Sequence, residues 1–118
     1  MNAEQMKDRT KAFAISIARL TELIRDTSIN KPYKAQLIRA SSSVGANYRA
    51  ARRAKSKADF INKLKIVEEE LDESLFFLEL LLEFNKSAEK NINEIYNEGE
   101  TLLKIIVATI VSVRKHRT

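Results

Sequence analysis

The stretch SKADFINKLKIVEEELDESLFFLELLLEF, residues 56–84, decides the fold because it contains neither glycine nor proline. Ser56 and Asp59 have the spacing of a capping box, which marks the start of a helix. The whole chain has only two glycines and one proline to interrupt regular structure. Such a chain favours long helices over a sheet with many turns, and an all-α fold is predicted.

Comparable signals mark the other helices. Asn2 and Gln5 have capping-box spacing, and Pro32 suits the first turn of a helix, where its missing N–H costs nothing. Short connections make successive helices antiparallel neighbours, so we expect an up-down-up-down four-helix bundle in a single domain spanning residues 1–118. The four helices are predicted at about residues 3–26, 32–54, 56–85 and 91–114.

The length, composition and net charge of the chain limit the classes of protein to which it can belong. At 118 residues the chain is one domain. The absence of cysteine excludes disulfides and thiolate zinc sites and favours a reducing, cytoplasmic setting. The longest apolar run, Ile105 to Val113, is far shorter than the roughly 20 residues of a membrane span, so no membrane partner is expected. A net charge of +5 favours anionic partners.

Two of the predicted helices carry more apolar residues than a lone bundle can bury. A surface helix normally has one apolar stripe. Here apolar residues wrap most of the circumference between Phe76 and Phe84, and again between Ile105 and Val111. This surplus predicts contact with further copies of the chain. The alternative is a monomer with an unusually apolar surface.

The second helix is rich in small residues and has one polar face. Ten of the twenty residues from Ala35 to Ala54 are Ala, Ser or Gly, which lets neighbouring backbones approach closely and would offset the cost of Gly45 in a helix. Antiparallel pairing predicts a polar seam with the third helix, anchored by a buried ion pair of Arg39 with Glu70 or Glu73. A catalytic or ligand pocket is the alternative interpretation. The residues of the seam are Arg39, Ser43, Asn47, Lys63, Glu70 and Glu73.

The segments QLIRASSSVGAN (residues 36–47) and SKADFINKLKIVEEELDESLFFL (residues 56–78) resemble the signature of a bacterial four-helix-bundle family. That family includes proteins encoded in intervening sequences of 23S ribosomal RNA. The resemblance implies a left-handed bundle that assembles as a homopentameric ring around a central channel. More distantly, that family is similar to accessory proteins of diversity-generating retroelements, which are basic pentamers that bind nucleic acid and a reverse transcriptase.

Charge is segregated along the chain. Residues 49–65 hold seven basic residues and one acidic residue, whereas residues 66–84 hold seven acidic residues and no basic one. In an up-down bundle the basic segment would share one end with the C-terminus and with Lys7, Arg9 and Lys11, and a ring would repeat this cluster in every subunit. Phosphate backbones are the obvious partner, so RNA or DNA binding is predicted. The predicted contacts are Arg49, Arg52, Arg53, Lys55, Lys57, Arg114, Lys115 and Arg117.

Two alternatives to nucleic-acid binding remain open. The basic residues could simply be solvated charges, or they could dock an acidic protein partner, as in a scaffold or a mobile-element accessory protein. Catalysis is not expected, because the only histidine, His116, lies in the tail and no glycine-rich phosphate loop exists. The acidic run from Glu68 to Glu73 lacks the histidines of bundle di-iron sites, so neither a metal nor a cofactor is expected.

Overall fold

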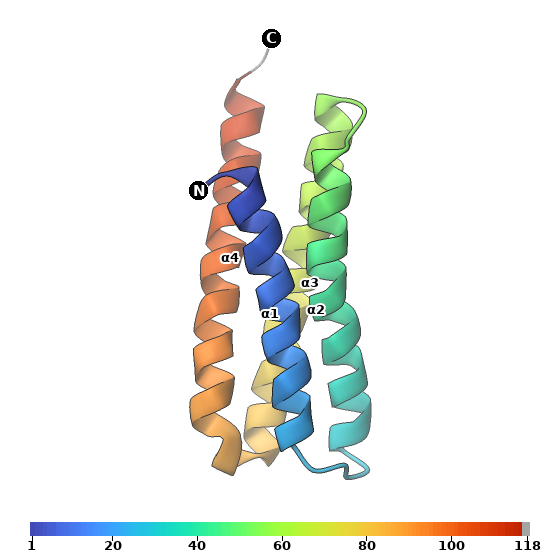
Figure 1. Ribbon diagram of the computed structural model, residues 1–118, viewed down its shortest axis with the longest axis vertical. Helices are drawn as coiled ribbons and strands as arrows, with labels where there is room; N and C mark the ends of the chain where they lie inside the picture. The colour runs from blue at the N-terminus through green and yellow to red at the C-terminus, as the bar shows by residue number, and fades with distance from the viewer. Residues whose placement is uncertain (117–118) are drawn as a thin grey trace.

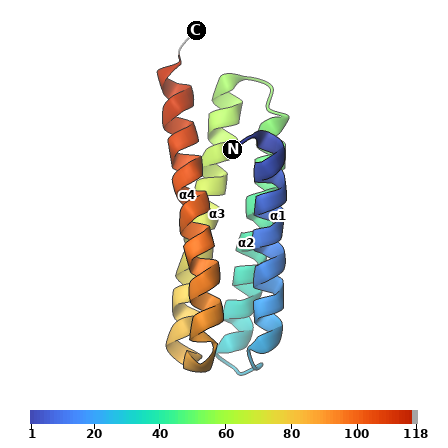
Figure 2. The same ribbon diagram turned by 60° about the vertical axis from the view of Figure 1, so that its left-hand side comes forward.

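The computed structural model describes residues 1–116, which form four α-helices and no strand. The fold is therefore all-α, as expected. Figure 1 shows that each helix runs opposite to the preceding one and that the start of α1 and the end of α4 lie toward one end of an elongated body; Figure 2 gives the same arrangement from a second direction. The helices are α1 (Ala3–Leu23), α2 (Asn30–Arg52), α3 (Lys57–Phe84) and α4 (Glu89–Lys115), with a 3-10 turn η1 (Lys86–Ala88) before α4.

The predicted helix starts have a clear basis in hydrogen bonding. At α1 the Gln5 N–H donates to Asn2 Oδ1 at 2.8 Å, and the Asn2 N–H donates to Gln5 Oε1 at 3.0 Å. This is a complete capping box. At α3 the Ser56 hydroxyl oxygen accepts the Asp59 N–H at 3.1 Å, but the Asp59 carboxylate accepts the N–H of Lys55 instead. The predicted box is therefore only half formed.

The connection between α1 and α2 is set by a lysine that sequence reasoning did not single out. Lys34 Nζ donates to the carbonyls of Thr21 and Ile24, at 3.0 and 2.5 Å, and pairs with Asp26 at 2.7 Å. An ammonium at a helix C-terminus satisfies carbonyls that have no partner within the helix. Consequently α1 ends at Leu23, three residues before the predicted boundary.

Contact between the helices is uneven. Among helices that lie side by side, the pair α2 and α3 shares the most extensive contact, whereas α1 and α4 share the least. The apolar core runs along the full length of the body, which measures 52 × 21 × 20 Å. Within the described residues, no helix has the length and apolar character that crossing a membrane would require.

The apolar surplus predicted for α3 and α4 is only partly buried by this chain. Leu78 and Ile106 lie in the core, whereas Phe76 and Phe84 remain 53% and 52% exposed. Tyr33 from α2 packs between Phe77 and Phe84, with ring centroids 6.2 and 6.3 Å apart. We call Tyr33, Phe76, Phe77 and Phe84 the aromatic patch; it lies on the outer surface of α2 and α3.

Candidate nucleic-acid interface

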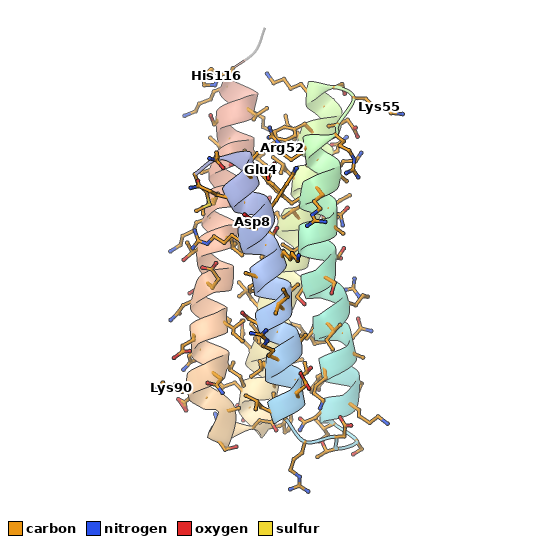
Figure 3. All side chains as sticks on the ribbon, viewed as in Figure 1. Glu4, Asp8, Arg52, Lys55, Lys90 and His116 are labelled. Carbon is orange, nitrogen blue, oxygen red and sulfur yellow. The ribbon has the colours of Figure 1, made fainter. Side chains whose placement is uncertain are left out.

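Most of the predicted nucleic-acid contacts lie at one end of the bundle, which we call the basic end. They stand at the end of α2, in the following turn, at the start of α3 and at the end of α4. Figure 3 labels Arg52, Lys55 and His116 there, together with the acidic Glu4 and Asp8 of α1, and Lys90 near the opposite end. The described members of the basic end are Arg49, Arg52, Arg53, Lys55, Lys57, Arg114 and Lys115. Arg117 lies outside the described residues.

Two of these cations are engaged within the protein. The Arg52 guanidinium lies over the Phe60 ring, 5.5 Å from its centroid, a cation–π arrangement that covers the apolar core at this end. Lys57 donates to the backbone carbonyl of His116 and so ties the start of α3 to the end of α4. Tyr48, the aromatic nearest the cluster in sequence, is buried and offers no stacking surface to a base.

The three cations near the start of α1 also differ from one another. Arg9 binds Glu98 of α4 through two hydrogen bonds, at 2.6 and 2.7 Å, and Lys7 pairs with Glu4 at 3.2 Å. The carboxylate of Glu98 raises the pKa of Arg9 above the usual arginine value, chiefly through the side-chain hydrogen bond. Lys11 is exposed and forms no ion pair with any acidic side chain of residues 1–116. Of these three cations, it is the one with charge left for a ligand.

A groove of about 310 Å³ runs between α1 and α2 beside Lys11. We call it the α1–α2 groove. Its lining contains two cations and no acidic residue, and most of the other lining side chains are small. Thr10 uses its hydroxyl internally, donating to the carbonyls of Met6 and Lys7. The lining residues are Thr10, Lys11, Ala14, Ser42, Gly45, Ala46 and Arg49.

The predicted polar seam contains the expected ion pairs but is not buried. Arg39 Nη1 lies 3.0 Å from Glu70 Oε2, and Arg39 Nη2 lies 2.5 Å from Glu73 Oε1. The side chain of Arg39 is 48% exposed and that of Glu73 is 36% exposed, whereas Glu70 is only 14% exposed. Predicting a buried pair was therefore wrong. The backbones of α2 and α3 lie close together, but the long side chain of Arg39 reaches the two carboxylates along the surface rather than through the interior.

Glu70 is the most perturbed carboxylate of the seam. Burial alone would raise its pKa, but the polar groups around it, among them Ser43 and the Arg39 guanidinium 3.0 Å away, outweigh burial and hold the pKa below its usual value. The charged form is therefore favoured in the folded protein. This arrangement stabilises contact between two helices and offers no unpaired group for chemistry.

The other three seam residues, Ser43, Asn47 and Lys63, bond within their own helices. Asn47 Nδ2 donates to the carbonyl and the hydroxyl of Ser43, both at 2.9 Å. Lys63 Nζ donates to Asp59 Oδ1 at 2.7 Å. The structure thus joins Arg39, Glu70 and Glu73 across the helices, while Asn47 and Lys63 each bond one turn away along the chain.

The acidic face of α3 does not form a metal site in the described residues. No group of three or more potential ligand side chains converges anywhere in residues 1–116. Glu79 accepts a hydrogen bond from the Tyr96 hydroxyl of α4 at 2.9 Å, which raises the pKa of that tyrosine. Glu79 therefore joins α3 to α4 at the surface.

Comparison with known proteins agrees with the sequence signature. The family model for the 23S rRNA-intervening sequence protein matches residues 4–108. The chain belongs to this family. A crystal structure of a protein of unknown function from the S23 ribosomal protein family of Bacteroides thetaiotaomicron is 32% identical, with a TM-score of 0.84, and the match covers 93% of this chain and 98% of that one. No match was found among curated proteins.

Proposed function

We propose that this member of the 23S rRNA-intervening sequence protein family is a non-catalytic protein that binds the phosphate backbone of RNA or DNA. The observation that carries the proposal is the gathering of seven described cations at the basic end, at the termini of three different helices. Counterion release from phosphates supplies affinity without a sequence code. No base-reading motif accompanies the cluster in the sequence, so binding should be strongly salt-dependent and weakly sequence-specific.

We further propose that the left-handed, up-down-up-down bundle acts as a homopentameric ring, as the family resemblance implies. The aromatic patch supports self-association, because Phe76 and Phe84 leave about half of their surface in water within one chain. In a cyclic assembly the basic end of every subunit would lie around one rim. Several weak phosphate contacts would then act together on one strand.

Fluorescence anisotropy with a labelled 20-nucleotide single-stranded RNA tests the binding proposal. We expect a complex at micromolar protein and low salt, with log K falling steeply against log salt. Arg53→Gln with Lys55→Gln should weaken binding, whereas Lys31→Gln with Lys90→Gln, which removes the same charge far from the basic end, should not. Absence of any complex at low salt would refute the proposal. Binding of poly-glutamate in place of RNA would assign the basic end to an acidic protein.

Light scattering tests the assembly. The wild-type chain should have the mass of a multimer in dilute buffer, and Phe76→Ser with Phe84→Ser should lower that mass. Ile15→Ser, which removes an exposed apolar side chain of α1 outside the aromatic patch, serves as the control. A stable single-copy particle for the wild type would exclude the ring.

A further inference from the structure

We propose that the phosphate backbone of a nucleic-acid strand seats in the α1–α2 groove and continues from there toward Arg53 and Lys55 at the tip of the basic end. This inference rests on the proposed function and assigns it a specific surface. Lys11 and Arg49 provide the charge, and small residues of α2 form the floor against which the backbone lies.

The charge of the groove is available to a ligand. Lys11 and Arg49 come from different helices, both are exposed, and neither forms an ion pair within residues 1–116. By contrast Arg52 and Lys57 at the tip already contact groups of the protein. Because α2 carries five basic residues and no acidic one, no carboxylate of that helix opposes an incoming phosphate.

Helix packing does not require a glycine at position 45, in the floor of the groove. A Cβ added at Gly45 would come no closer than 3.6 Å to Thr10 Oγ1, which is ordinary van der Waals contact. Helix packing therefore has room for alanine at a position where glycine destabilises a helix interior. A glycine without a packing reason fits a place where a ligand approaches the backbone closely.

The remaining lining residues suit a polyanion. Ser42 is exposed and its hydroxyl makes no hydrogen bond to another group of residues 1–116, so it can donate to a phosphate oxygen. Thr10 cannot, because its hydroxyl already donates to backbone carbonyls. The groove also follows the direction of the helices, which allows an extended strand to pass along it toward the basic end.

Neutralising the two cations is the first test. With the same 20-nucleotide RNA, Lys11→Gln with Arg49→Gln should lower the slope of log K against log salt by about 1.4, because each lost phosphate contact lowers it by about 0.7. This change in slope corresponds to roughly a 25-fold loss of affinity at 0.1 M salt. Lys31→Gln with Lys90→Gln is the charge-matched control. If the groove variant binds like this control while Arg53→Gln with Lys55→Gln loses affinity, the strand seats at the tip and the groove assignment is wrong.

Filling the groove without changing charge is the second test. Ala46→Gln adds a neutral side chain at an exposed lining position, so the fold should be unchanged while RNA affinity falls several-fold at an unchanged salt slope. Ala35→Gln makes the same change at an exposed position of α2 outside the groove and should have no effect. Equal affinities for the two variants would overturn the inference.

A competition distinguishes a strand from a small anion. A free phosphate ion can make only a fraction of the contacts that a strand makes along the groove, so millimolar inorganic phosphate should leave the RNA bound. Displacement of the RNA by inorganic phosphate would assign the groove to a small anion instead. A wild-type chain that binds no RNA at low salt would remove the proposed function together with the groove.

Discussion

Replacing each of the two glycines by alanine should change stability in opposite directions. Both lie inside helices, where alanine is favoured over glycine by about 1 kcal/mol. At Gly45 the new methyl group meets only ordinary contacts, the nearest at 3.6 Å. At Gly99 it would lie 2.8 Å from Leu75 Cδ2 and 3.2 Å from Phe13 Cε1, so buried side chains must move.

The magnitudes follow from these contacts. Overpacking a buried site costs about 1–3 kcal/mol, so Gly99→Ala should destabilise the fold by about 1 kcal/mol after the gain in helix propensity is included. Gly45→Ala should stabilise it by about 1 kcal/mol. The two variants should differ by about 2 kcal/mol, or roughly 8 °C in melting temperature at about 4 °C per kcal/mol for a chain of this size.

Urea unfolding followed by far-ultraviolet circular dichroism measures both variants against the wild type. Each titration should be repeated at tenfold higher protein concentration, because subunit association adds a concentration-dependent contribution to the apparent free energy of unfolding. The reasoning is refuted if Gly99→Ala is as stable as Gly45→Ala, or if Gly45→Ala is less stable than the wild type. Either result would mean that the space around these helices is not as described.

Two further changes probe polar contacts between segments. Asn30 and Asn85 exchange two side-chain hydrogen bonds at 2.9 Å, and Asn30 is 3% exposed, so Asn30→Ala should cost about 2–3 kcal/mol in urea unfolding, whereas exposed Asn93→Ala should not. Because the folded-state pKa of Glu70 is lowered, its contribution to stability is present above the usual glutamate value of 4.5 and is lost as the pH falls through the folded-state value. Glu70→Gln should therefore unfold with a shallower pH dependence in acid, and an unchanged profile would contradict the role of the seam.

The fold was predictable because its signals are local. Capping residues such as Asn2 and Ser56 act within one turn, and the scarcity of glycine and proline leaves long helices as the default. The end of α1 was not predictable in the same way. It depends on Lys34, which lies ten residues beyond Ile24 and reaches back to its carbonyl, and nothing in the local sequence reports that contact.

The candidate site was predictable in charge but not in shape. Helical periodicity placed Arg39 opposite Glu70 and Glu73, yet it could not show that the guanidinium lies along the surface. The small residues of α2 indicated close helix contact, and the structure turns Gly45 toward Thr10 of α1, where an added Cβ would make ordinary van der Waals contact, but it makes Gly99 the crowded glycine. Both differences depend on helix rotation and spacing, which a pattern of residue types leaves open.

The segregation of charge explains why positive charge remains unpaired on one side of the bundle. α2 has five basic and no acidic residues, and its neighbour α3 has eight acidic and three basic ones. Only Arg39 among the α2 cations reaches the acidic face, because its side chain projects toward α3. Arg49 faces α1, where the lining of the groove contains no carboxylate. A sequence of the same net charge with acidic residues distributed along α2 would fold equally well but would lack a surface for phosphates. The separation of charge between α2 and α3, rather than the net charge of +5, is therefore the feature that favours nucleic-acid binding.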